Sequence, residues 1–105
     1  MIVTFEKEYL SDLYVTGKTK DKKHRFQPDV VTKYIERIKI LERAQKIEDL
    51  FVFNSLNYEV LRGDKKGISS IRVNKQYRIE FTVNDNGVEP YIAVCNILEL
   101  SNHYK

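Results

Sequence analysis

The sequence predicts an α+β domain in which helices precede a mainly antiparallel sheet. Apolar residues in the first half of the chain recur at helical spacing, whereas from Leu56 onward they alternate with polar residues. Helical patterns followed by a series of strand patterns favour helices packed on one face of a sheet. With a length of 105 residues, the chain is expected to form one domain, residues 1–105, around one modest core.

The composition indicates an ordinary soluble globular protein. Hydrophobic residues make up 42% of the chain and charged residues 31%, a balance that argues against disorder. No apolar run approaches the roughly 20 residues of a membrane span, and the first residues lack the pattern of a signal peptide. The single cysteine, Cys95, excludes an internal disulfide. We therefore expect a cytoplasmic protein with no membrane partner.

The first half of the chain predicts a strand and two helices. Residues 2–5 form a short β-rich run, and residues 7–16 carry apolar side chains at helical spacing, with Gly17 as a C-terminal stop. Pro28 suits the first turn of a longer amphipathic helix. A further short helical turn is expected over residues 47–53. The buried stripe of the longer helix is predicted to comprise Val31, Tyr34, Ile35, Ile38 and Leu41.

A basic loop, residues 18–27, separates the two predicted helices. Its stretch from Lys18 to Arg25 holds five bases and one acid, a local charge of +4 that exceeds the net charge of +3 of the whole chain. The loop is either a solvated connection or an arm that faces phosphates. Such an arm would strengthen binding to a nucleic acid without recognising its base sequence. The candidate phosphate contacts are Lys20, Lys22, Lys23 and Arg25.

The second half of the chain predicts antiparallel strands. Its alternating apolar residues are Val60, Ile71, Val73, Tyr77, Ile79, Phe81 and Val83. The sequence Asp85-Asn86-Gly87 is a strong turn signal. The run from Tyr91 to Leu100 is almost continuously apolar, which is typical of a strand in a central position of a sheet.

Side-chain parity predicts the register of one hairpin. A two-residue loop would place Ile71 opposite Arg78, an apolar residue opposite a charge. A three-residue loop at 74–76 pairs Ile71 with Ile79 instead and keeps the apolar residues on one face. The other face then pairs Arg72 with Arg78, and Ser70 with Glu80.

Arginines gathered on one sheet face indicate an anion site, because the guanidinium fork donates two parallel hydrogen bonds and stays charged. An exposed network of arginines with Glu80 is the alternative. Arg62, at the start of a Gly-bounded loop, could extend the anion site. The loop glycines lack the spacing of a nucleotide-binding P-loop. The histidines and acids show no spacing typical of metal ligands, so no cofactor and metal-free chemistry are expected.

The stretches L-R-G-D-K-K-G and S-I-R-V-N-K-Q-Y-R-I-E-F, with a polar-aromatic tail, resemble the HigB toxins of the RelE/ParE superfamily. The resemblance implies a RelE/ParE-like fold, two N-terminal helices on a small, mainly antiparallel twisted sheet. It also implies a toxin of a type II toxin–antitoxin system that cleaves mRNA on the ribosome. The implied partner is a HigA-like helix-turn-helix antitoxin, bound in a hetero-oligomer.

The resemblance implies attack of a ribose 2′-hydroxyl on the adjacent phosphate. Arg78 matches the family's phosphate-stabilising arginine, and Arg62 matches a basic position before the loop glycine. Glu59 falls where some members have a histidine, and His103 and Tyr104 occupy the place of the terminal catalytic residues. Arg72 and the loop residues Lys65 and Lys66 are expected to assist in RNA binding.

The tail departs from the HigB pattern, and this leaves alternatives open. Asn102-His103-Tyr104 stands where the family has Asp-Tyr-His, so the roles of base and acid are unassigned. A ParE-like toxin that inhibits gyrase without cleaving RNA is the second hypothesis. A non-toxic RNA-binding module with decayed catalysis is the third.

Overall fold

The structure, a computed structural model, describes residues 1–102. Two α-helices and five strands account for most of it. The strands are β1 (Ile2–Phe5), β2 (Glu59–Val60), β3 (Ser69–Arg72), β4 (Tyr77–Asp85) and β5 (Ala93–Asn102), and the helices are α1 (Glu8–Thr16) and α2 (Pro28–Arg43). Short 3₁₀ turns lie at Lys22–His24, Ile47–Leu50, Asn54–Leu56 and Gly63–Lys65.

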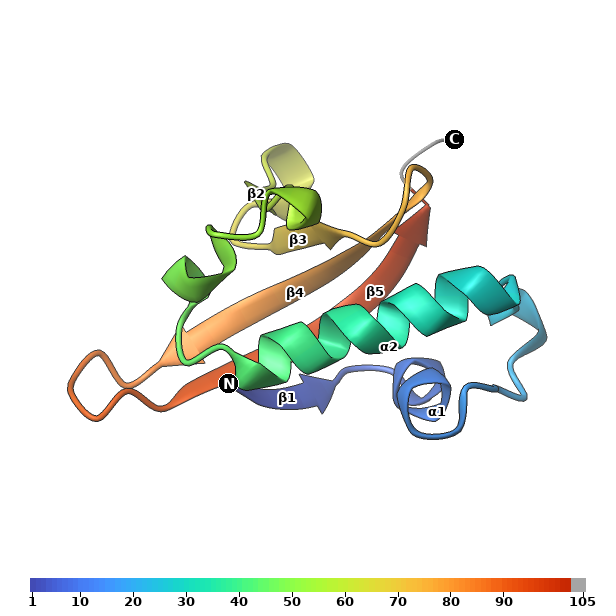
Figure 1. The fold of residues 1–105 in the computed structure, drawn as a ribbon, viewed down its shortest axis with the longest axis horizontal. Helices are drawn as coiled ribbons and strands as arrows, with labels where there is room; N and C mark the ends of the chain where they lie inside the picture. Colours follow the sequence, from blue (N-terminus) through green and yellow to red (C-terminus); the bar gives the residue numbers. More distant parts are fainter. Residues whose placement is uncertain (103–105) are drawn as a thin grey trace.

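The strands form one sheet in the order β1-β5-β4-β3-β2. The β1–β5 pair is parallel and the other three pairs are antiparallel. The expected α+β class is therefore confirmed, and so is the central position of the last strand, since β5 lies between β1 and β4. Helix α2 lies across one face of the sheet, with α1 beside the end of β1 (Figure 1).

Helix α1 ends, and helix α2 begins, where the sequence predicts a boundary. Helix α1 stops because Gly17 adopts a φ of 76° and its N–H donates to the carbonyl of Leu13. Pro28 occupies the first turn of α2, where no backbone N–H is needed. Within residues 1–102, no helix is long and apolar enough to cross a membrane.

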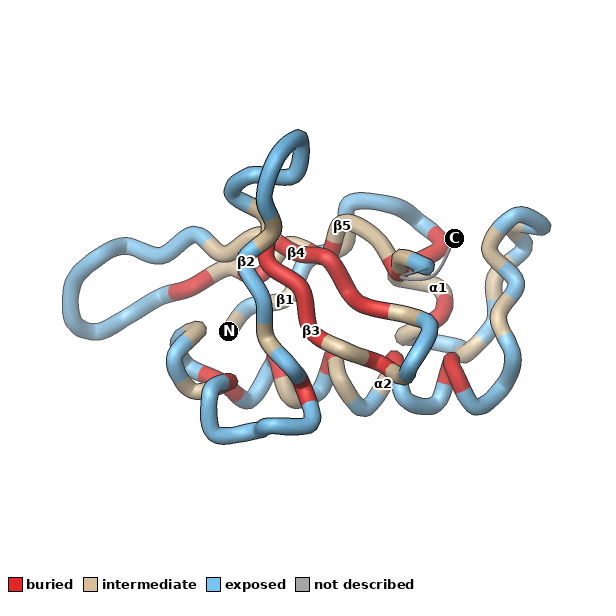
Figure 2. Tube along the Cα trace, turned by 90° about the horizontal axis from the view of Figure 1, so that it is seen from above, coloured by how far each residue is buried: buried red, intermediate tan, exposed pale blue. Residues whose placement is uncertain are grey.

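The core lies between the helices and one face of the sheet. Figure 2 shows the buried residues of β3 and β4. Tyr34, at the centre of α2, is fully buried, and its hydroxyl donates to the carbonyl of Leu10 at 2.7 Å. The largest fully buried side chains also include Leu10, Ile38, Leu41, Leu50, Leu56, Ile71, Ile79, Phe81 and Ile97.

The β3–β4 hairpin has the predicted register. Ile71 pairs with Ile79, and Arg72 pairs with Arg78. The N–H of Val73 donates to the carbonyl of Tyr77 at 3.0 Å, which leaves residues 74–76 as the loop. Parity was sufficient here because a slip of one residue would have exposed the whole apolar set.

A β-bulge in the β4–β5 pair explains why β5 reads as a continuous apolar run. Glu80 pairs with Glu99, but Phe81 pairs with Ile97, so Leu98 is an extra residue. Strict alternation would place Ile97 and Leu100 on opposite faces, whereas both are buried in the core.

Three predicted details are wrong. Val60 is 62% exposed, because β2 is a two-residue edge strand and does not continue the buried alternation. The last strand begins at Ala93; Tyr91 and Ile92 are exposed in the preceding loop, which the side chain of Asn86 organises by accepting from the N–H of Ile92. The expected turn over residues 47–53 ends at Leu50, and Phe51, Val52 and Phe53 are exposed.

Ile71→Ala should lower the free energy of unfolding by about 2–4 kcal/mol, because it opens a cavity in a fully packed core. Val60→Ala removes an exposed side chain and should change stability by less than about 0.5 kcal/mol. Urea denaturation of the purified chain measures both. Equal effects of the two substitutions would contradict the assignment of β2 to an exposed edge.

Candidate functional site

The face of the sheet opposite the helices is polar. Because the β4–β5 bulge restores the alternation after Leu98, it aligns Glu80 with Glu99, and Arg78 with Ser101. Arg72 of β3 lies opposite Arg78. This surface therefore carries the adjacent carboxylates of Glu80 and Glu99. Two residues along β4 from Glu80, it carries the adjacent arginines Arg72 and Arg78.

Arg78 is buried, with only 6% of the residue exposed. Its Nε donates to Ser70 Oγ at 2.9 Å, and its Nη2 donates to the carbonyl of Asn57 at 2.6 Å and to that of Ser70 at 3.3 Å. Burial lowers the pKa of the guanidinium, while the charges of Glu59 and Glu80 oppose that shift. The surface is therefore not the open arginine face that the sequence suggested, because Arg78 is held beneath it in a fixed orientation.

Glu59 lies beside Arg78, as its candidate role requires. Its Oε2 is 3.9 Å from Arg78 Nη2, and 47% of its side chain is exposed, so a ligand could reach the carboxylate. The Nε of Arg72 donates to the carbonyl of Asn74, which turns that guanidinium toward the hairpin loop. Arg62 is exposed at the start of the Gly63–Lys65 turn.

An open cleft of about 520 Å³ lies on the polar face beside the C-terminal end of β5. Lys23 and Arg25 come from the basic loop, Lys65 comes from the Gly-bounded loop, and Glu80 and Glu99 come from the sheet. His24, Phe26, Tyr77, Leu100, Ser101 and Asn102 complete the lining. Cations from two segments distant in sequence therefore line one hollow together with a pair of carboxylates.

Each of the two carboxylates has a lysine of its own. Lys65 Nζ is 2.8 Å from Glu80 Oε2, and Lys7 Nζ is 2.6 Å from Glu99 Oε2. Tyr9 also donates its hydroxyl to Glu99 Oε1 at 2.5 Å. Burial raises the pKa of Glu99, but the hydrogen bonds from Lys7 and Tyr9 outweigh burial and hold that pKa below its ordinary value.

His24 is the residue that sequence reasoning missed. Its ring stacks on Tyr9, with centroids 3.7 Å apart and planes 6° from parallel, and its Nδ1 is 2.8 Å from Asp21 Oδ2. The hydrogen bond from His24 lowers the pKa of Asp21. The three-residue spacing of Asp21 and His24 was the available signal, but the contact with Tyr9 joins residues that no local pattern relates.

The structure brings only some of the predicted RNA contacts together. Lys23, Arg25 and Lys65 line the cleft. Lys20, Lys22 and Lys66 are exposed and lie outside its lining. His103 and Tyr104 lie outside the described residues; they follow Asn102, which lines the cleft.

Neither a metal nor a reactive thiol is indicated by the described side chains. Among residues 1–102, no group of three or more His, Cys, Asp or Glu side chains is arranged to hold a metal ion. Cys95 is buried in β5, and burial raises the pKa of its thiol to about 12, so the thiol stays protonated.

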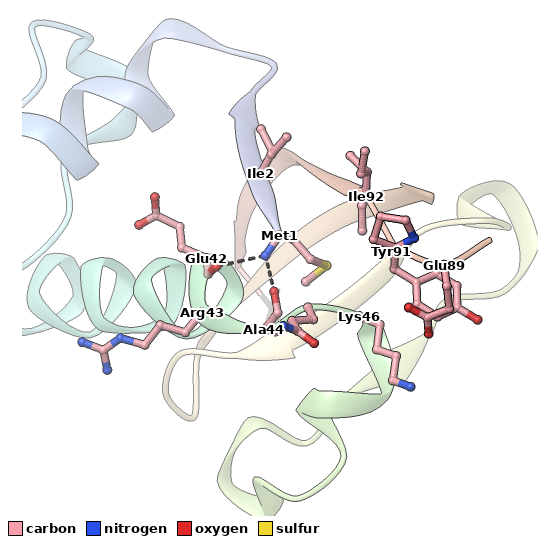
Figure 3. A pocket seen from close by; sticks show the side chains of 12 residues that line it. Met1, Ile2, Glu42, Arg43, Ala44, Lys46, Glu89, Tyr91 and Ile92 are labelled. Atoms are coloured by element: carbon pink, nitrogen blue, oxygen red, sulfur yellow. Dashed lines mark hydrogen bonds between the residues drawn. The ribbon is translucent and has the colours of Figure 1, made fainter. Parts of the chain in front are cut away.

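A second hollow, of about 570 Å³, lies near the other end of β5. Figure 3 shows Met1 within it, where the α-amino group donates to the carbonyls of Glu42 and Ala44 at the end of α2. Tyr91 and Ile92 form another part of the lining. None of the residues proposed for RNA chemistry lies here, so the smaller, cation-lined cleft is the candidate site.

Comparison with known proteins shows similarity to a family of toxins. A family model described as the RelE-like toxin HigB of type II toxin–antitoxin systems matches residues 3–94. The chain is 38% identical to Toxin HigB-1 of Vibrio cholerae serotype O1 over 82 residues, which is 77% of this chain and 82% of that protein. The chain belongs to the HigB-like toxins. Its membership confirms the resemblance in the hairpin and the Gly-bounded loop.

Solved structures place this HigB-like toxin in a wider fold group. The YoeB/ParE toxin from Agrobacterium tumefaciens superimposes with a TM-score of 0.57 at 18% identity, covering 99% of this chain and 100% of that one. A YoeB–YefM complex from Staphylococcus aureus gives a TM-score of 0.58 at 21% identity, covering 99% and 98%. At these identities the likeness shows the RelE/ParE-like fold.

Arg78→Ala should lower the free energy of unfolding by about 2–4 kcal/mol, because it leaves the hydroxyl and carbonyl of buried Ser70, and the carbonyl of Asn57, without their donor. Arg62→Ala, the matched substitution of an exposed arginine, should change stability by less than about 0.5 kcal/mol. Thermal and urea unfolding give both values. A stable Arg78→Ala variant would show that these hydrogen bonds are dispensable to the fold.

The depressed pKa of Glu99 should make part of the stability pH-dependent. Its contribution is fully present above the unfolded value of 4.5 and is lost as the pH falls through the lower folded value. The stability difference between the wild type and Glu99→Gln should therefore be largest near neutral pH and shrink in acid. Urea titrations across that range measure it. A difference that grows on acidification would contradict the Lys7–Glu99 assignment.

Proposed function

We propose that this HigB-like toxin is a cytoplasmic, ribosome-dependent mRNA endoribonuclease. The observation that supports this best is the cation-lined cleft over a paired-carboxylate floor, with Glu59 and Arg78 on the same polar face. The cations suit the charge of an RNA strand, and carboxylates are proton acceptors. This combination supports the proposed reaction class, because phosphodiester cleavage without a metal uses a proton acceptor and positive charge near the phosphate.

The proposed reaction is an internal displacement at phosphorus. The ribose 2′-oxygen loses its proton and forms a bond to the adjacent phosphorus, while the bond from phosphorus to the leaving 5′-oxygen breaks and that oxygen gains a proton. The products are a 2′,3′-cyclic phosphate and a free 5′-hydroxyl. No metal and no cofactor take part in the proposed steps.

Glu59 is proposed as the base and Arg78 as the fixed positive charge that stabilises the phosphate. The carboxylate of Glu59 is accessible, and its Oε2 lies 3.9 Å from Arg78 Nη2, beside the fixed charge. Because the hydrogen bonds to Ser70 and Asn57 already hold the guanidinium, no reorganisation is required when charge develops on the phosphate. His103 and Tyr104 are proposed to protonate the leaving oxygen.

The exposed cations outside the cleft are proposed to contact ribosomal RNA and the flanking message. These are Lys20, Lys22, Arg62, Lys66 and the half-buried Arg72. Toxin–antitoxin family membership supports an antitoxin partner, which we propose to be a HigA-like helix-turn-helix protein bound in a hetero-oligomer. The Staphylococcus aureus relative was itself solved as a YoeB–YefM complex.

Induced expression should produce transcript ends at codon-associated positions in translating cells, with 2′,3′-cyclic phosphate termini. Glu59→Gln should reduce cleavage by about 10²-fold or more, because the amide cannot accept the proton. Glu36→Gln, an exposed carboxylate on α2, is the matched control and should cleave normally. Mapping of transcript 3′ ends measures cleavage by the wild type, Glu59→Gln and Glu36→Gln. Growth arrest with inhibited gyrase and intact transcripts would support a ParE-like activity instead and overturn the proposal.

A further inference from the structure

A cluster of polar contacts fastens the basic loop to the sheet beside the cleft. The cluster, called here the clasp, comprises Lys7, Tyr9, Asp21, His24 and Glu99. Glu99 lies at its centre, bonded to Lys7 and Tyr9, with His24 Nε2 at 3.9 Å from Glu99 Oε1. A carboxylate can only accept, so Asp21 requires a proton on His24 Nδ1 and fixes the orientation of the ring.

The clasp joins three segments that are far apart in the sequence. Lys7 and Tyr9 lie at the start of α1, Asp21 and His24 in the basic loop, and Glu99 in β5. The Tyr9 hydroxyl also accepts from the N–H of Leu100 at 3.2 Å, which ties the cluster to the backbone of β5. The ring of His24 on Tyr9 therefore joins the loop to this cluster. Phe26, near the end of the loop, makes a separate contact with Tyr77 of β4, with ring centroids 5.3 Å apart.

The residues on either side of His24 are the cations of the cleft. Lys23 and Arg25 are exposed, both line the cleft, and neither side chain forms an ion pair with any residue from 1 to 102. Lys65, on the other side, is paired with Glu80. The two cations are thus available to a ligand, and the residue between them in the sequence is His24.

We propose that His24 is a positioning residue that sets Lys23 and Arg25 across the cleft from Lys65, so that an RNA strand is held from both sides. This inference rests on the proposed RNA substrate. It goes further in assigning a task to His24, which lies between the two cations of the basic loop. The clasp converts a basic loop, which would otherwise attract RNA from many orientations, into one wall of a defined groove.

The exposure of the His24 side chain differs from that expected of a residue with a purely structural role. A residue that served only the core would be fully buried, whereas 28% of the His24 side chain is exposed and lines the cleft. The Tyr14–Glu42 hydrogen bond provides a control for the effect of losing such a contact on the fold alone. It joins the same two residue types as the Tyr9–Glu99 bond, but neither Tyr14 nor Glu42 lines the cleft.

A double-mutant cycle tests the inference with ribosomes programmed with a defined mRNA. His24→Ala should raise KM about tenfold and leave kcat within about twofold, because it misplaces binding groups and not the reacting ones. In a Lys23→Ala/Arg25→Ala background, His24→Ala should add less than about twofold, since the groups that it positions are gone. Tyr14→Phe is the matched control and should leave both constants unchanged.

Amide hydrogen exchange and thermal unfolding accompany the kinetics. In His24→Ala, exchange should rise in residues 18–27 and not in β4 or β5. If His24→Ala does not fold, Asp21→Ala, which changes a partly exposed carboxylate, should shift KM in the same direction. An unchanged KM in His24→Ala would overturn the inference, and so would a full tenfold effect that persists in the Lys23→Ala/Arg25→Ala background. In either case, cleavage by the wild type leaves the proposed function standing. A wild type that cleaves nothing on the ribosome would instead refute the proposed function, and the inference with it.

Discussion

The arrangement of the site depends on one electrostatic constraint, the pairing of Glu80 with Glu99 across β4 and β5. Like charges directly opposite each other destabilise a sheet. Each carboxylate is neutralised by a lysine from a different part of the chain, Lys65 for Glu80 and Lys7 for Glu99. These two bonds bring the Gly-bounded loop, which joins β2 and β3, and the start of α1, which follows β1, to the same pair of carboxylates on the polar face. Because Tyr9 follows Lys7 and receives the ring of His24, the basic loop is brought there as well.

Arg78 shows how the same face can serve both the fold and the proposed chemistry. A buried guanidinium is stable only when its donors find acceptors, and the carbonyl of Asn57 and the hydroxyl and carbonyl of Ser70 supply them. Those bonds use Nε and Nη2 and hold the charge under a surface that Glu59 borders. Substitution of Arg78 therefore changes stability and chemistry together, so a loss of activity by itself would not assign it a catalytic role. The exposed Glu59 separates the two effects, since its removal leaves the buried bonds of Arg78 intact.

The parts of this structure that follow local rules could be predicted from the sequence. The β3–β4 register followed from parity because Ile71 and Ile79 must share the buried face, and both helix boundaries followed from Gly17 and Pro28. The bulge at Glu80 and Phe81 could not be predicted, because an extra residue in a strand is visible only against its partner. The burial of Arg78 and the contact of His24 with Tyr9 depend on segments that the fold alone brings together. His24 in particular read as one member of a charge run, although its role in the structure is to anchor that run.

The cations on the two sides of the cleft differ in whether a carboxylate already neutralises them. Lys65 is already neutralised by Glu80, so a phosphate that approaches it competes with a carboxylate at 2.8 Å. Lys23 and Arg25 form no ion pair with any residue from 1 to 102, although the charge of Lys23 interacts with the nearby carboxylate of Asp21. Long-range attraction of RNA should therefore come mainly from the basic loop, whereas a phosphate at Lys65 would share the ammonium group with Glu80. A phosphate held there would lie beside Glu80, two residues along β4 from Arg78, on the face where the scissile phosphate is proposed to lie.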